Sequence, residues 1–281
     1  MSTAAASTER DLTSQVIDRD AASTADSDSL LRVTGLARSF RGLQALSGYN
    51  LTLRNREILG VIGPNGAGKT TLFNVLTGFL PPTSGQMSLR GRNISGLGAE
   101  KIAALGIART FQNIRLFGRM SVLDNVLTAQ QLRDRAGFWP TLVSARGFRQ
   151  TERNLERRAL EHLDQFGLAG FRDALAPSLP YGLQRKLEIA RALATEPSIL
   201  LLDEPAAGMN PQETVELTET IRDIHSRFGL TLIVVEHDMS LIMRLCERIQ
   251  VLNYGRIIAE GSPAEVRANP AVIEAYLGTE E

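Results

Sequence analysis

The chain has 281 residues, 43% of them hydrophobic and 22% charged, which is enough for one large domain or two smaller ones with substantial cores. Lysine plus arginine and aspartate plus glutamate both number 31, so the formal net charge is zero and the basic excess typical of nucleic-acid-binding proteins is missing. No apolar run approaches the roughly 18 residues of a membrane-spanning helix, and the single Cys246 excludes an internal disulfide, which together predict a soluble cytosolic protein without direct membrane insertion.

The first part of the chain predicts a tail followed by strands. Residues 1–28 are small, polar and mixed in charge, and they lack the basic start and apolar core of a secretion signal, so we predict a disordered N-terminal tail over residues 1–29. From Leu30 onward, LRVTGLARSF and YNLTLR alternate apolar and polar residues, as antiparallel strands do. A buried strand, ILGVIG, and a helix, TTLFNVLTGFL, follow, and the helix is expected to end at PPTSG. MSLRGRNI predicts two further short strands.

The second part of the chain is helix-rich and then alternates helices with strands. Residues 113–178 are charged and helix-prone, and Leu155, Ala159, Leu163 and Phe166 recur three or four apart, which predicts one buried stripe and a solvated charged face. The later alternation of helices with continuous apolar strands favours a parallel-sheet α/β core. The segments concerned are RKLEIARALAT, SILLLDE, PQETVELTETIRDIHSRFG, LTLIVVEHD, a further helix and the hairpin-like IQVLNYGRIIAEG.

Residues 63–70 read GPNGAGKT and match the phosphate-binding pattern G-x-x-x-x-G-K-[ST], called the P-loop. This loop follows a predicted strand and opens a predicted helix, so backbone N–H groups around Gly66 and Gly68 and the helix N-terminus would face phosphate oxygens. Lys69 would reach the β- and γ-phosphates, and the Thr70 hydroxyl would help to coordinate Mg²⁺. A glycine-rich turn with an incidental lysine is the structural alternative, which the strand–turn–helix context disfavours. The predicted nucleotide contacts in this region are Gly63, Pro64, Asn65, Gly66, Ala67, Gly68, Lys69, Thr70 and Thr71.

Two acidic residues, Asp203 and Glu204, end the motif ILLLDE. The four apolar residues predict a buried strand, so both carboxylates would emerge at its C-terminal end, where α/β folds bind ligands. Asp203 is suited to the coordination shell of Mg²⁺, and Glu204 to polarising the water that attacks the γ-phosphate. Acids at the end of a strand are common, and it is their position downstream of the P-loop that favours a functional interpretation.

These motifs resemble those of the ATP-binding subunits of ABC transporters, and the resemblance covers residues 30–278 with the motifs in family order. It implies an ABC ATP-binding domain over residues 30–281 with a P-loop NTPase α/β core, an antiparallel β subdomain and an α-helical subdomain inserted at about 113–178. The residues from about 250 to 281 would form a C-terminal extension. ATP and Mg²⁺ are the implied cofactors.

The resemblance gives roles to three more residues. Phe40 would stack on adenine, although such a ring is equally often part of a core. Gln112, in RTFQN, would contact the metal and the attacking water and transmit its state to the membrane subunits, and His237, in VVEHD, would contact the γ-phosphate. The implied catalytic residues are Lys69, Gln112, Glu204 and His237, and the implied metal ligands are Thr70, Gln112 and Asp203.

The hexapeptide LPYGLQ, residues 179–184, lies where the family has its LSGGQ signature. In these ATPases two subunits close head to tail, and the signature of one subunit completes the nucleotide site of the other. Tyr181 and Gly182 would therefore contact the partner's nucleotide, through the Gly182 N–H and the helix N-terminus. Pro180 replaces the family's serine donor and Leu183 its glutamine, while Asn210 replaces an aspartate in the loop that touches the opposite subunit. The alternative for Pro180 is simply a proline at a helix start.

Within the family, the chain resembles the LivG-type ATPases of branched-chain amino-acid importers, through GIARTFQNIRLF, LEIARAL, DEPAAGMNP, EHDM, AYLG and the insertion GFWPTLVSARGFRQTE. This likeness implies a second ABC ATPase subunit as homo- or heterodimer partner, two transmembrane permeases and an extracytoplasmic substrate-binding protein. It places the chain at the cytoplasmic face of the inner or plasma membrane, bound through the permeases. Importers of urea or short amides, and exporters or lipid transporters of the same fold, are alternatives. A soluble ABC ATPase acting on nucleic acid or the ribosome is disfavoured, because the chain has one P-loop, no heptad run and no net positive charge.

Overall fold

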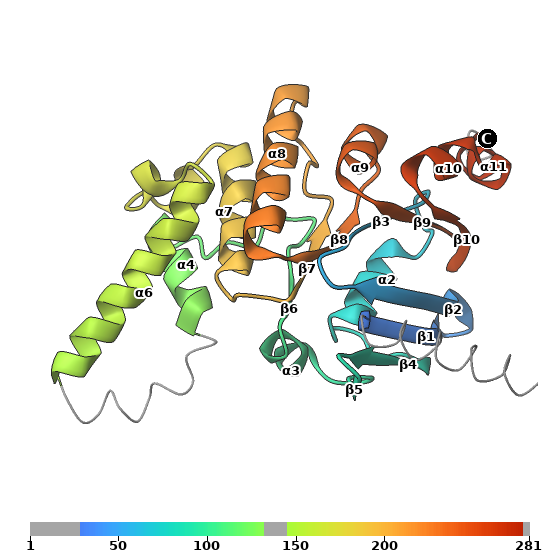
Figure 1. Cartoon of the computed structure of the whole chain (residues 1–281), viewed down its shortest axis with the longest axis horizontal. Helices are drawn as coiled ribbons and strands as arrows, with labels where there is room; N and C mark the ends of the chain where they lie inside the picture. Colours follow the sequence, from blue (N-terminus) through green and yellow to red (C-terminus); the bar gives the residue numbers. More distant parts are fainter. Residues whose placement is uncertain (1–28, 132–144, 278–281) are drawn as a thin grey trace, which may run out of the picture.

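The structure, a computed structural model, describes residues 29–131 and 145–277 (Figure 1). The predicted N-terminal tail lies outside the described residues except for Ser29, which begins the first strand. Part of the sequence GFWPTLVSARGFRQTE also lies outside them. Within the described ranges, no helix is long and apolar enough to cross a membrane.

A four-stranded antiparallel sheet forms the lower part of Figure 1, in the order β2-β1-β4-β5. It confirms the strands predicted from alternating residues near the N-terminus and the short pair at MSLRGRNI. The turn between the first two strands uses Arg41 and Gly42, which both have positive φ. The strands of this sheet are β1 (Ser29–Phe40), β2 (Leu43–Arg54), β4 (Ser84–Leu89) and β5 (Arg92–Asn93).

The second sheet has six strands in the order β10-β9-β3-β8-β7-β6. All neighbouring pairs are parallel except the hairpin of β9 and β10, whose turn residues Tyr254 and Gly255 both have positive φ. The predicted parallel α/β core and the predicted hairpin are therefore confirmed. The strands are β3 (Ile58–Ile62), β6 (Ile107–Arg109), β7 (Ile199–Asp203), β8 (Thr231–Val235), β9 (Arg248–Asn253) and β10 (Arg256–Gly261).

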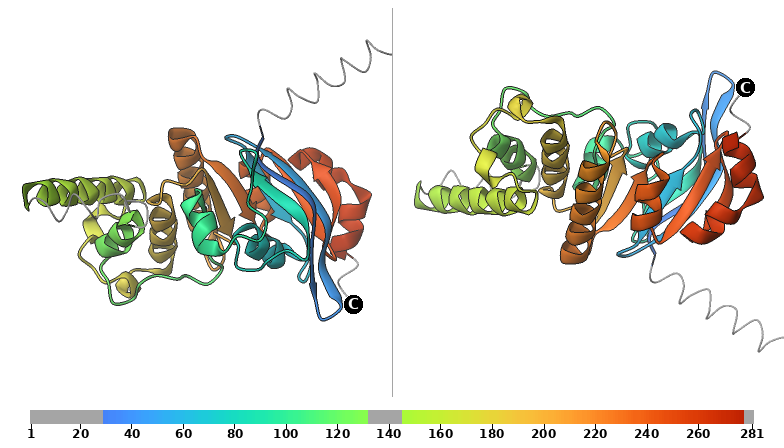
Figure 2. Two further views of the ribbon diagram at one scale, coloured as in Figure 1. Left: turned by 90° about the horizontal axis from the view of Figure 1, so that it is seen from below. Right: turned by 90° about the horizontal axis from the view of Figure 1, so that it is seen from above.

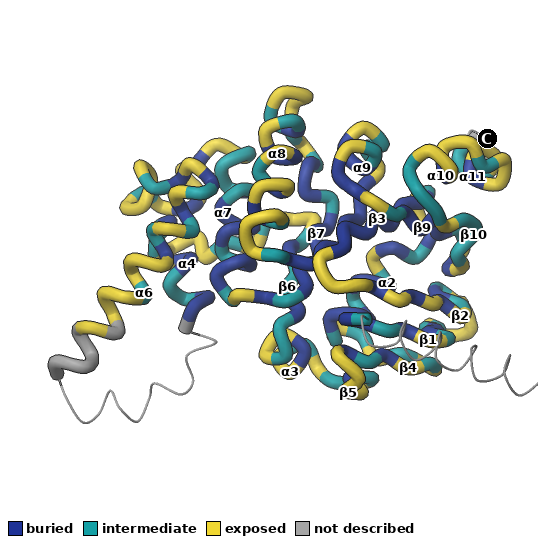
Figure 3. Tube along the Cα trace, viewed as in Figure 1, coloured by how far each residue is buried: buried dark blue, intermediate teal, exposed yellow. Residues whose placement is uncertain are grey.

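The six-stranded sheet is covered on both faces, which explains its continuous apolar strands. Along β7, Ile199 and Leu201 belong to a core shared with the antiparallel sheet and α2, whereas Leu200 and Leu202 belong to a core shared with the helices on the opposite face. Figure 3 shows the resulting belt of buried backbone between the two layers. The helices are α2 (Lys69–Leu76) on the first face and α7 (Tyr181–Leu193), α8 (Pro211–Phe228) and α9 (Met239–Leu245) on the second.

The helix-rich segment forms a separate packed part at one end of the molecule, far from β1 and β2 in every view (Figures 1 and 2). Along its longest helix, Leu155 is half-buried and Ala159, Leu163 and Phe166 are buried, which confirms the predicted apolar stripe. The charged positions between them are largely exposed, as the pattern predicts. The helices of this segment are α4 (Val122–Gln131) and α6 (Ala145–Gln165), followed by the short turns η2 (Ala169–Phe171) and η3 (Ala176–Ser178).

Helix α2 is shorter than the sequence predicts. We expected a helix through TTLFNVLTGFL, but α2 ends at Leu76 and Thr77 caps it, with its hydroxyl donating to the Phe73 carbonyl over 2.5 Å. Gly78 follows with φ of 73°, and a Cβ there would lie 2.5 Å from the Leu97 carbonyl oxygen. The chain must therefore leave the helix at this glycine, although the apolar residues beyond it continue a helical spacing.

Three short helices complete the described chain: α3 (Ala99–Ala104), α10 (Pro263–Ala268) and α11 (Pro270–Leu277). The last two cover the hairpin edge of the six-stranded sheet. Because β3, β6, β7 and β8 are parallel neighbours in this sheet, their C-terminal ends meet at one edge. These four strand ends and the loops that leave them carry the P-loop, Gln112, the two acids Asp203 and Glu204, and His237.

Candidate functional site

The P-loop connects the buried strand β3 to α2, and glycine is required at two of its positions. A Cβ at Gly63 would lie 2.1 Å from the Leu252 carbonyl oxygen, and one at Gly68 would lie 2.6 Å from that of Ala45. Gly66 also has positive φ but has open space around it. The loop is thus wedged between β9 and β2 while one side stays open, which suits a backbone that closes around a ligand.

Lys69 begins α2 and turns back over the loop. Its ammonium donates to the carbonyl oxygens of Gly63 and Pro64 at 2.6 and 3.0 Å. Burial lowers the pKa of Lys69, while the negative charges of Glu204 and Asp203 raise it. The lysine therefore lies against its own loop and within electrostatic reach of both acids at the end of β7. Thr70 is exposed and Thr71 half-buried at the start of the same helix.

Asp203 is the last residue of β7 and is paired with an arginine that the sequence reasoning missed. The Arg109 guanidinium, at the end of the neighbouring β6, lies 2.7 Å from Asp203 Oδ2 and donates to Asn74 Oδ1 on α2 over 2.6 Å. Burial raises the pKa of Asp203, and the hydrogen bond and charge of Arg109 lower it. One sequence signal could have indicated Arg109: it is an isolated charge at the end of the apolar run GIA. In the sheet, two strands separate β6 from the P-loop strand β3.

Glu204, Gln112 and His237 come together from three loops. Gln112 Nε2 donates to Glu204 Oε2 over 2.7 Å, and His237 Nδ1 lies 3.8 Å from Glu204 Oε1. The His237 side chain is 64% exposed, so it borders solvent beside the carboxylate. The sequence predicted these three residues as parts of one site, and the structure places them side by side at the edge of the sheet.

A second residue that the sequence reasoning missed is Glu236, which directly precedes His237. Its buried carboxylate accepts the backbone N–H of Ala206 over 2.8 Å and that of His237 over 3.1 Å. In the sequence VVEHD only the histidine was predicted to be functional. A glutamate at a strand end is normally solvated, so the pattern gives no sign that Glu236 is buried.

The LPYGLQ hexapeptide begins α7, with Pro180 at the N-cap position. This confirms the expected helix start. Tyr181 is exposed, and a Cβ at Gly208 would lie 3.2 Å from its ring. A Cβ at Gly182 would lie 3.2 Å from Glu213 Oε1, so this glycine also allows α7 to approach the start of α8 within the same chain. At that start, Asn210 and Glu213 form a reciprocal capping box, which an asparagine serves as well as an aspartate.

One turn into α7, a fully buried ion pair holds the loop that carries Gln112. Arg185 and Glu188 lie 2.8 Å apart, and Arg185 is the largest side chain buried below 2% exposure among the described residues. Arg185 also donates to the carbonyl oxygens of Phe111 and Gln112, both at 2.7 Å. Glu188 accepts the N–H groups of Phe111 and Arg115 at 3.3 Å. The signature helix and the Gln112 loop are therefore joined by side chain to backbone bonds.

Phe40, the predicted adenine contact, ends β1 and is exposed. The Arg38 guanidinium lies over its ring, 4.6 Å from the centroid. The strand that follows, β2, reaches the P-loop through Ala45, as its contact with Gly68 shows. The role of Phe40 in adenine stacking stays a prediction.

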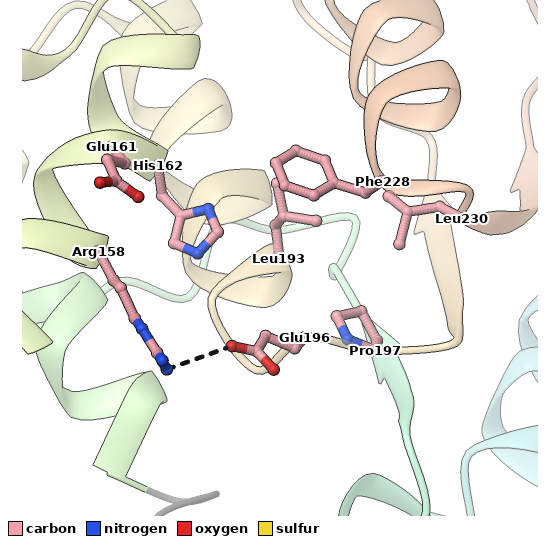
Figure 4. A pocket seen from close by; sticks show the side chains of 8 residues that line it. All are labelled: Arg158, Glu161, His162, Leu193, Glu196, Pro197, Phe228 and Leu230. Atoms are coloured by element: carbon pink, nitrogen blue, oxygen red, sulfur yellow. Dashed lines mark ion pairs between the residues drawn. The ribbon is translucent and has the colours of Figure 1, made fainter.

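Two hollows lie beside these elements. One, of about 330 Å³, is bounded by residues 64–67 of the P-loop on one side and by the hairpin turn and α11 on the other. The other, of about 430 Å³, lies between α6 and the ends of α7 and α8, where Arg158 and Glu196 form an ion pair of 3.7 Å (Figure 4). Burial lowers the pKa of His162 in its wall, and the charges of Glu196 and Glu161 oppose this. This second hollow contains none of the predicted site residues.

The family of the chain follows from comparisons with known proteins. Residues 46–207 match the family model described as ABC transporter, and residues 256–281 match the one described as Branched-chain amino acid ATP-binding cassette transporter. Two solved structures agree with this. An ATP-binding cassette of an ABC transporter in its ADP conformation has a TM-score of 0.76 at 28% identity, covering 89% of this chain and 99% of that one. The structure of cbiO1 from Clostridium perfringens, part of the ABC transporter complex cbiONQ, has a TM-score of 0.71 at 27% identity, covering 90% and 96%.

Curated relatives match almost the whole chain. The high-affinity branched-chain amino acid transport ATP-binding protein LivG of Salmonella typhimurium is 48% identical, over 90% of this chain and 99% of LivG. Its counterpart BraF of Pseudomonas aeruginosa is 46% identical, over 89% and 98%. The lipopolysaccharide export system ATP-binding protein LptB of Escherichia coli is 34% identical, over 88% and 97%. The predicted fold class is confirmed, and the chain belongs to the ABC transporter family as a nucleotide-binding, ATP-hydrolysing cassette subunit.

Proposed function

We propose that this chain couples ATP hydrolysis to the uptake of branched-chain amino acids through partner permeases. The observation that carries the proposal is the match to LivG and BraF over nearly the full length of all three chains. The exporter subunit LptB is similar over the same length but at 34% rather than 46–48% identity, which favours the importer. The C-terminal match at residues 256–281 supports the same substrate class independently of the P-loop half of the chain.

In this proposal the P-loop holds the β- and γ-phosphates of ATP. The Lys69 ammonium, which donates to two carbonyl oxygens of its own loop, would exchange them for phosphate oxygens, and the N–H groups at the start of α2 would add further donors. The remaining predicted contacts of the loop, from Gly63 to Thr71, would follow the phosphates around its open side. Phe40 would stack on the adenine ring.

Hydrolysis would take place beside Glu204. Its carboxylate accepts a hydrogen bond from Gln112 and lies near His237 on the other side. Glu204 would polarise the water that attacks the γ-phosphate, Gln112 would orient that water, and the exposed His237 imidazole would donate to a γ-phosphate oxygen. Stabilisation of the charge on the transferred phosphoryl group by fixed donors is the main catalytic contribution expected of such a site.

The chain's own residues fit a magnesium ion that accompanies ATP. Thr70, Gln112 and Asp203 would supply a hydroxyl, an amide oxygen and a carboxylate, which are the hard oxygen ligands that Mg²⁺ prefers. Among the described residues, no group of three or more His, Cys, Asp or Glu side chains could hold a metal by itself. The ion would therefore depend on the phosphates and water for its other ligands, and when bound it would neutralise charge on the β- and γ-phosphates.

The proposed assembly follows the family arrangement. A second ABC ATPase subunit would face this one head to tail, so that Tyr181 and Gly182 complete the partner's nucleotide site. Two permeases would hold both subunits at the cytoplasmic face of the membrane, and an extracytoplasmic binding protein would deliver the amino acid. The exposed start of α7 lies next to the loop that contains Gly208, because a Cβ at Gly208 would lie 3.2 Å from the Tyr181 ring. This closeness supports a single surface, formed by the start of α7 and the Gly208 loop, that faces the partner subunit.

The first prediction tests this function with the Lys69→Ala variant in the complete transporter, which is purified with its partner ATPase and permeases, rebuilt in liposomes and supplied with the binding protein. The wild type is expected to take up leucine in an ATP-dependent manner, and Lys69→Ala to lose both uptake and nucleotide binding, because the loop loses its cation for phosphate. Lys101→Ala, at an exposed position of α3, is the matched control and should behave as wild type. Undiminished ATP binding by Lys69→Ala would refute the P-loop assignment, whereas ATP turnover without leucine, isoleucine or valine uptake would refute the substrate class.

A further inference from the structure

Glu236 lies between the loop after β7, which carries Glu204, and the loop after β8, which carries His237. It follows β8, which pairs in parallel with β7, and its side chain is 1% exposed. One carboxylate oxygen, Oε1, accepts the N–H of Ala206 over 2.8 Å, in the loop that leaves β7. The other oxygen, Oε2, accepts the N–H groups of His237 and Asp238 at 3.1 and 3.5 Å, in the loop that leaves β8.

A carboxylate suits this position because all of its partners are donors. An ionised glutamate offers only acceptor sites, and here both oxygens face backbone N–H groups. Burial raises the pKa of Glu236, and the hydrogen bonds from the amides of Ala206 and Asp238 lower it. Its nearest ionisable neighbour is the His237 imidazole, whose Nδ1 lies 3.9 Å from Oε2, and its hydrogen bonds are to backbone N–H groups. A buried carboxylate is costly, so its presence needs a compensating gain.

The neighbours of these amides indicate what the gain is. Glu204 lies two residues before Ala206, has a φ of 46° and donates its own N–H to the Val235 carbonyl oxygen over 2.8 Å. His237 comes directly after Glu236. The same short stretch of β8 and its exit therefore holds the backbone of the proposed water activator on one side and carries the proposed γ-phosphate contact on the other.

We propose that Glu236 is a positioning residue that fixes the spacing of Glu204 and His237 for hydrolysis. The inference rests on the proposed roles of those two residues. Glu236 itself does not touch the nucleotide, because its carboxylate is enclosed and both of its oxygens accept backbone N–H groups. Its effect is on the hydrolytic step and not on ATP capture, since the P-loop contacts of Lys69 belong to a different loop.

A second buried glutamate provides a matched control. Glu57, 6% exposed, precedes β3 at the end of the sheet opposite to the P-loop. It accepts the N–H of Arg54 over 2.8 Å and an N–H of Arg248 over 2.6 Å. Glu57→Gln therefore disturbs a buried carboxylate of the same residue type while leaving the loops after β7 and β8 untouched.

The second prediction concerns Glu236→Gln and Glu57→Gln in the full transporter complex. A glutamine must turn its NH₂ group toward at least one backbone N–H, so Glu236→Gln is expected to lower kcat about tenfold or more with KM for ATP within about twofold of wild type. In a Glu204→Gln background, Glu236→Gln should still form the ATP-bound dimer. Glu57→Gln should lower the melting temperature and leave kcat unchanged.

Two results would overturn the positioning role alone. These are a Glu236→Gln kcat within twofold of wild type beside a slow Glu204→Gln, or a loss of ATP binding and thermal stability that accounts for the whole change in rate. If Glu204→Gln itself hydrolyses ATP at the wild-type rate, the proposed role of Glu204 fails and this inference fails with it.

Discussion

At the scale of single residues, Glu204 combines a strained backbone with an acidic side chain. A positive φ is uncommon for a residue with a side chain and costs free energy unless the surroundings impose it. Here the surroundings do so, since the Glu204 N–H is held by the Val235 carbonyl and its side chain by Gln112. In this conformation the Glu204 carboxylate lies beside Gln112 and His237.

The third prediction is that Glu204→Gln retains ATP binding and loses most of its turnover. The amide keeps the shape of the side chain but is a poor base, and general acid–base groups contribute about a hundredfold or more to rates. Steady-state hydrolysis together with the affinity for ATP would measure the two effects separately. Glu219→Gln, at an exposed position of α8, is the control and should match wild type. A Glu204→Gln variant with normal hydrolysis would leave the attacking water without its proposed base.

The residues that the sequence could and could not indicate differ in a physical way. Lys69, Asp203 and Glu204 belong to patterns whose spacing follows from one strand and one loop, so local sequence is enough to predict them. Arg109 acts on Asp203 from a neighbouring strand 94 positions away in the chain. Such a partner is known only once the strand order is known, because β6 and β7 become neighbours through a parallel crossover.

At the scale of elements, helix α7 is held to the Gln112 loop by the Arg185–Glu188 pair. Both side chains are at most 1% exposed, and Arg185 has four hydrogen-bond partners, two of them backbone carbonyls of the loop. Burial raises the pKa of Glu188, and the charge of Arg185 lowers it. The start of α7, with Tyr181 and Gly182, and the Gln112 side chain are therefore expected to move together when the helical part shifts.

The fourth prediction is that Arg185→Met destabilises the chain by about 3–5 kcal/mol, because Glu188 and two carbonyls lose a buried partner. The double variant with Glu188→Leu should cost less than the sum of the two single variants, since it leaves no unpaired charge. Denaturant unfolding of the purified chain would measure this. Lys186→Ala, which removes the more exposed 3.7 Å pair with Glu216, should cost less than about 1 kcal/mol. Additive effects of the two buried substitutions would contradict the proposed pair.

Helices and strands were predicted well where the spacing of apolar residues indicates which side is buried. They were predicted less well where a contact with a distant segment sets the end or the burial of the element. The stripe of Ala159, Leu163 and Phe166 and the apolar strand β7 carry their burial in their own spacing. By contrast, α2 ends at Leu76, and the chain turns away at Gly78, where the Leu97 carbonyl leaves no room for a side chain; the local sequence does not encode this contact. Likewise, Arg185 and Glu188 are spaced like a surface ion pair, and only the loop that covers them makes them a buried one.

At the scale of the whole molecule, the chain would contribute to two nucleotide sites, each formed jointly with the partner subunit. Its P-loop edge would bind one nucleotide, and the start of α7 would complete the partner's site. Pro180 is the N-cap of α7 and has neither a side-chain donor nor a backbone N–H. The N–H groups of Gly182 and the following turn remain, so the site keeps helix-end donors but lacks the hydroxyl found in the usual signature.

The fifth prediction is that the partner's site, completed by this chain's LPYGLQ, hydrolyses ATP more slowly than the site at this chain's own P-loop. In a heteromeric complex, Lys69→Ala silences the site at this chain's P-loop, so the remaining turnover belongs to the site at the partner's P-loop. The equivalent lysine variant of the partner leaves only the site at this chain's P-loop active. One missing charge-assisted hydrogen bond is worth about 1.5–3 kcal/mol, or roughly ten- to a hundredfold in rate if it acts only in the transition state. Pro180→Ser should recover part of this difference, and Pro177→Ser, at an exposed position just before α7, should not. Equal rates at the two sites would mean that the helix end alone satisfies the γ-phosphate, and Pro180 would then be only the residue that starts the helix.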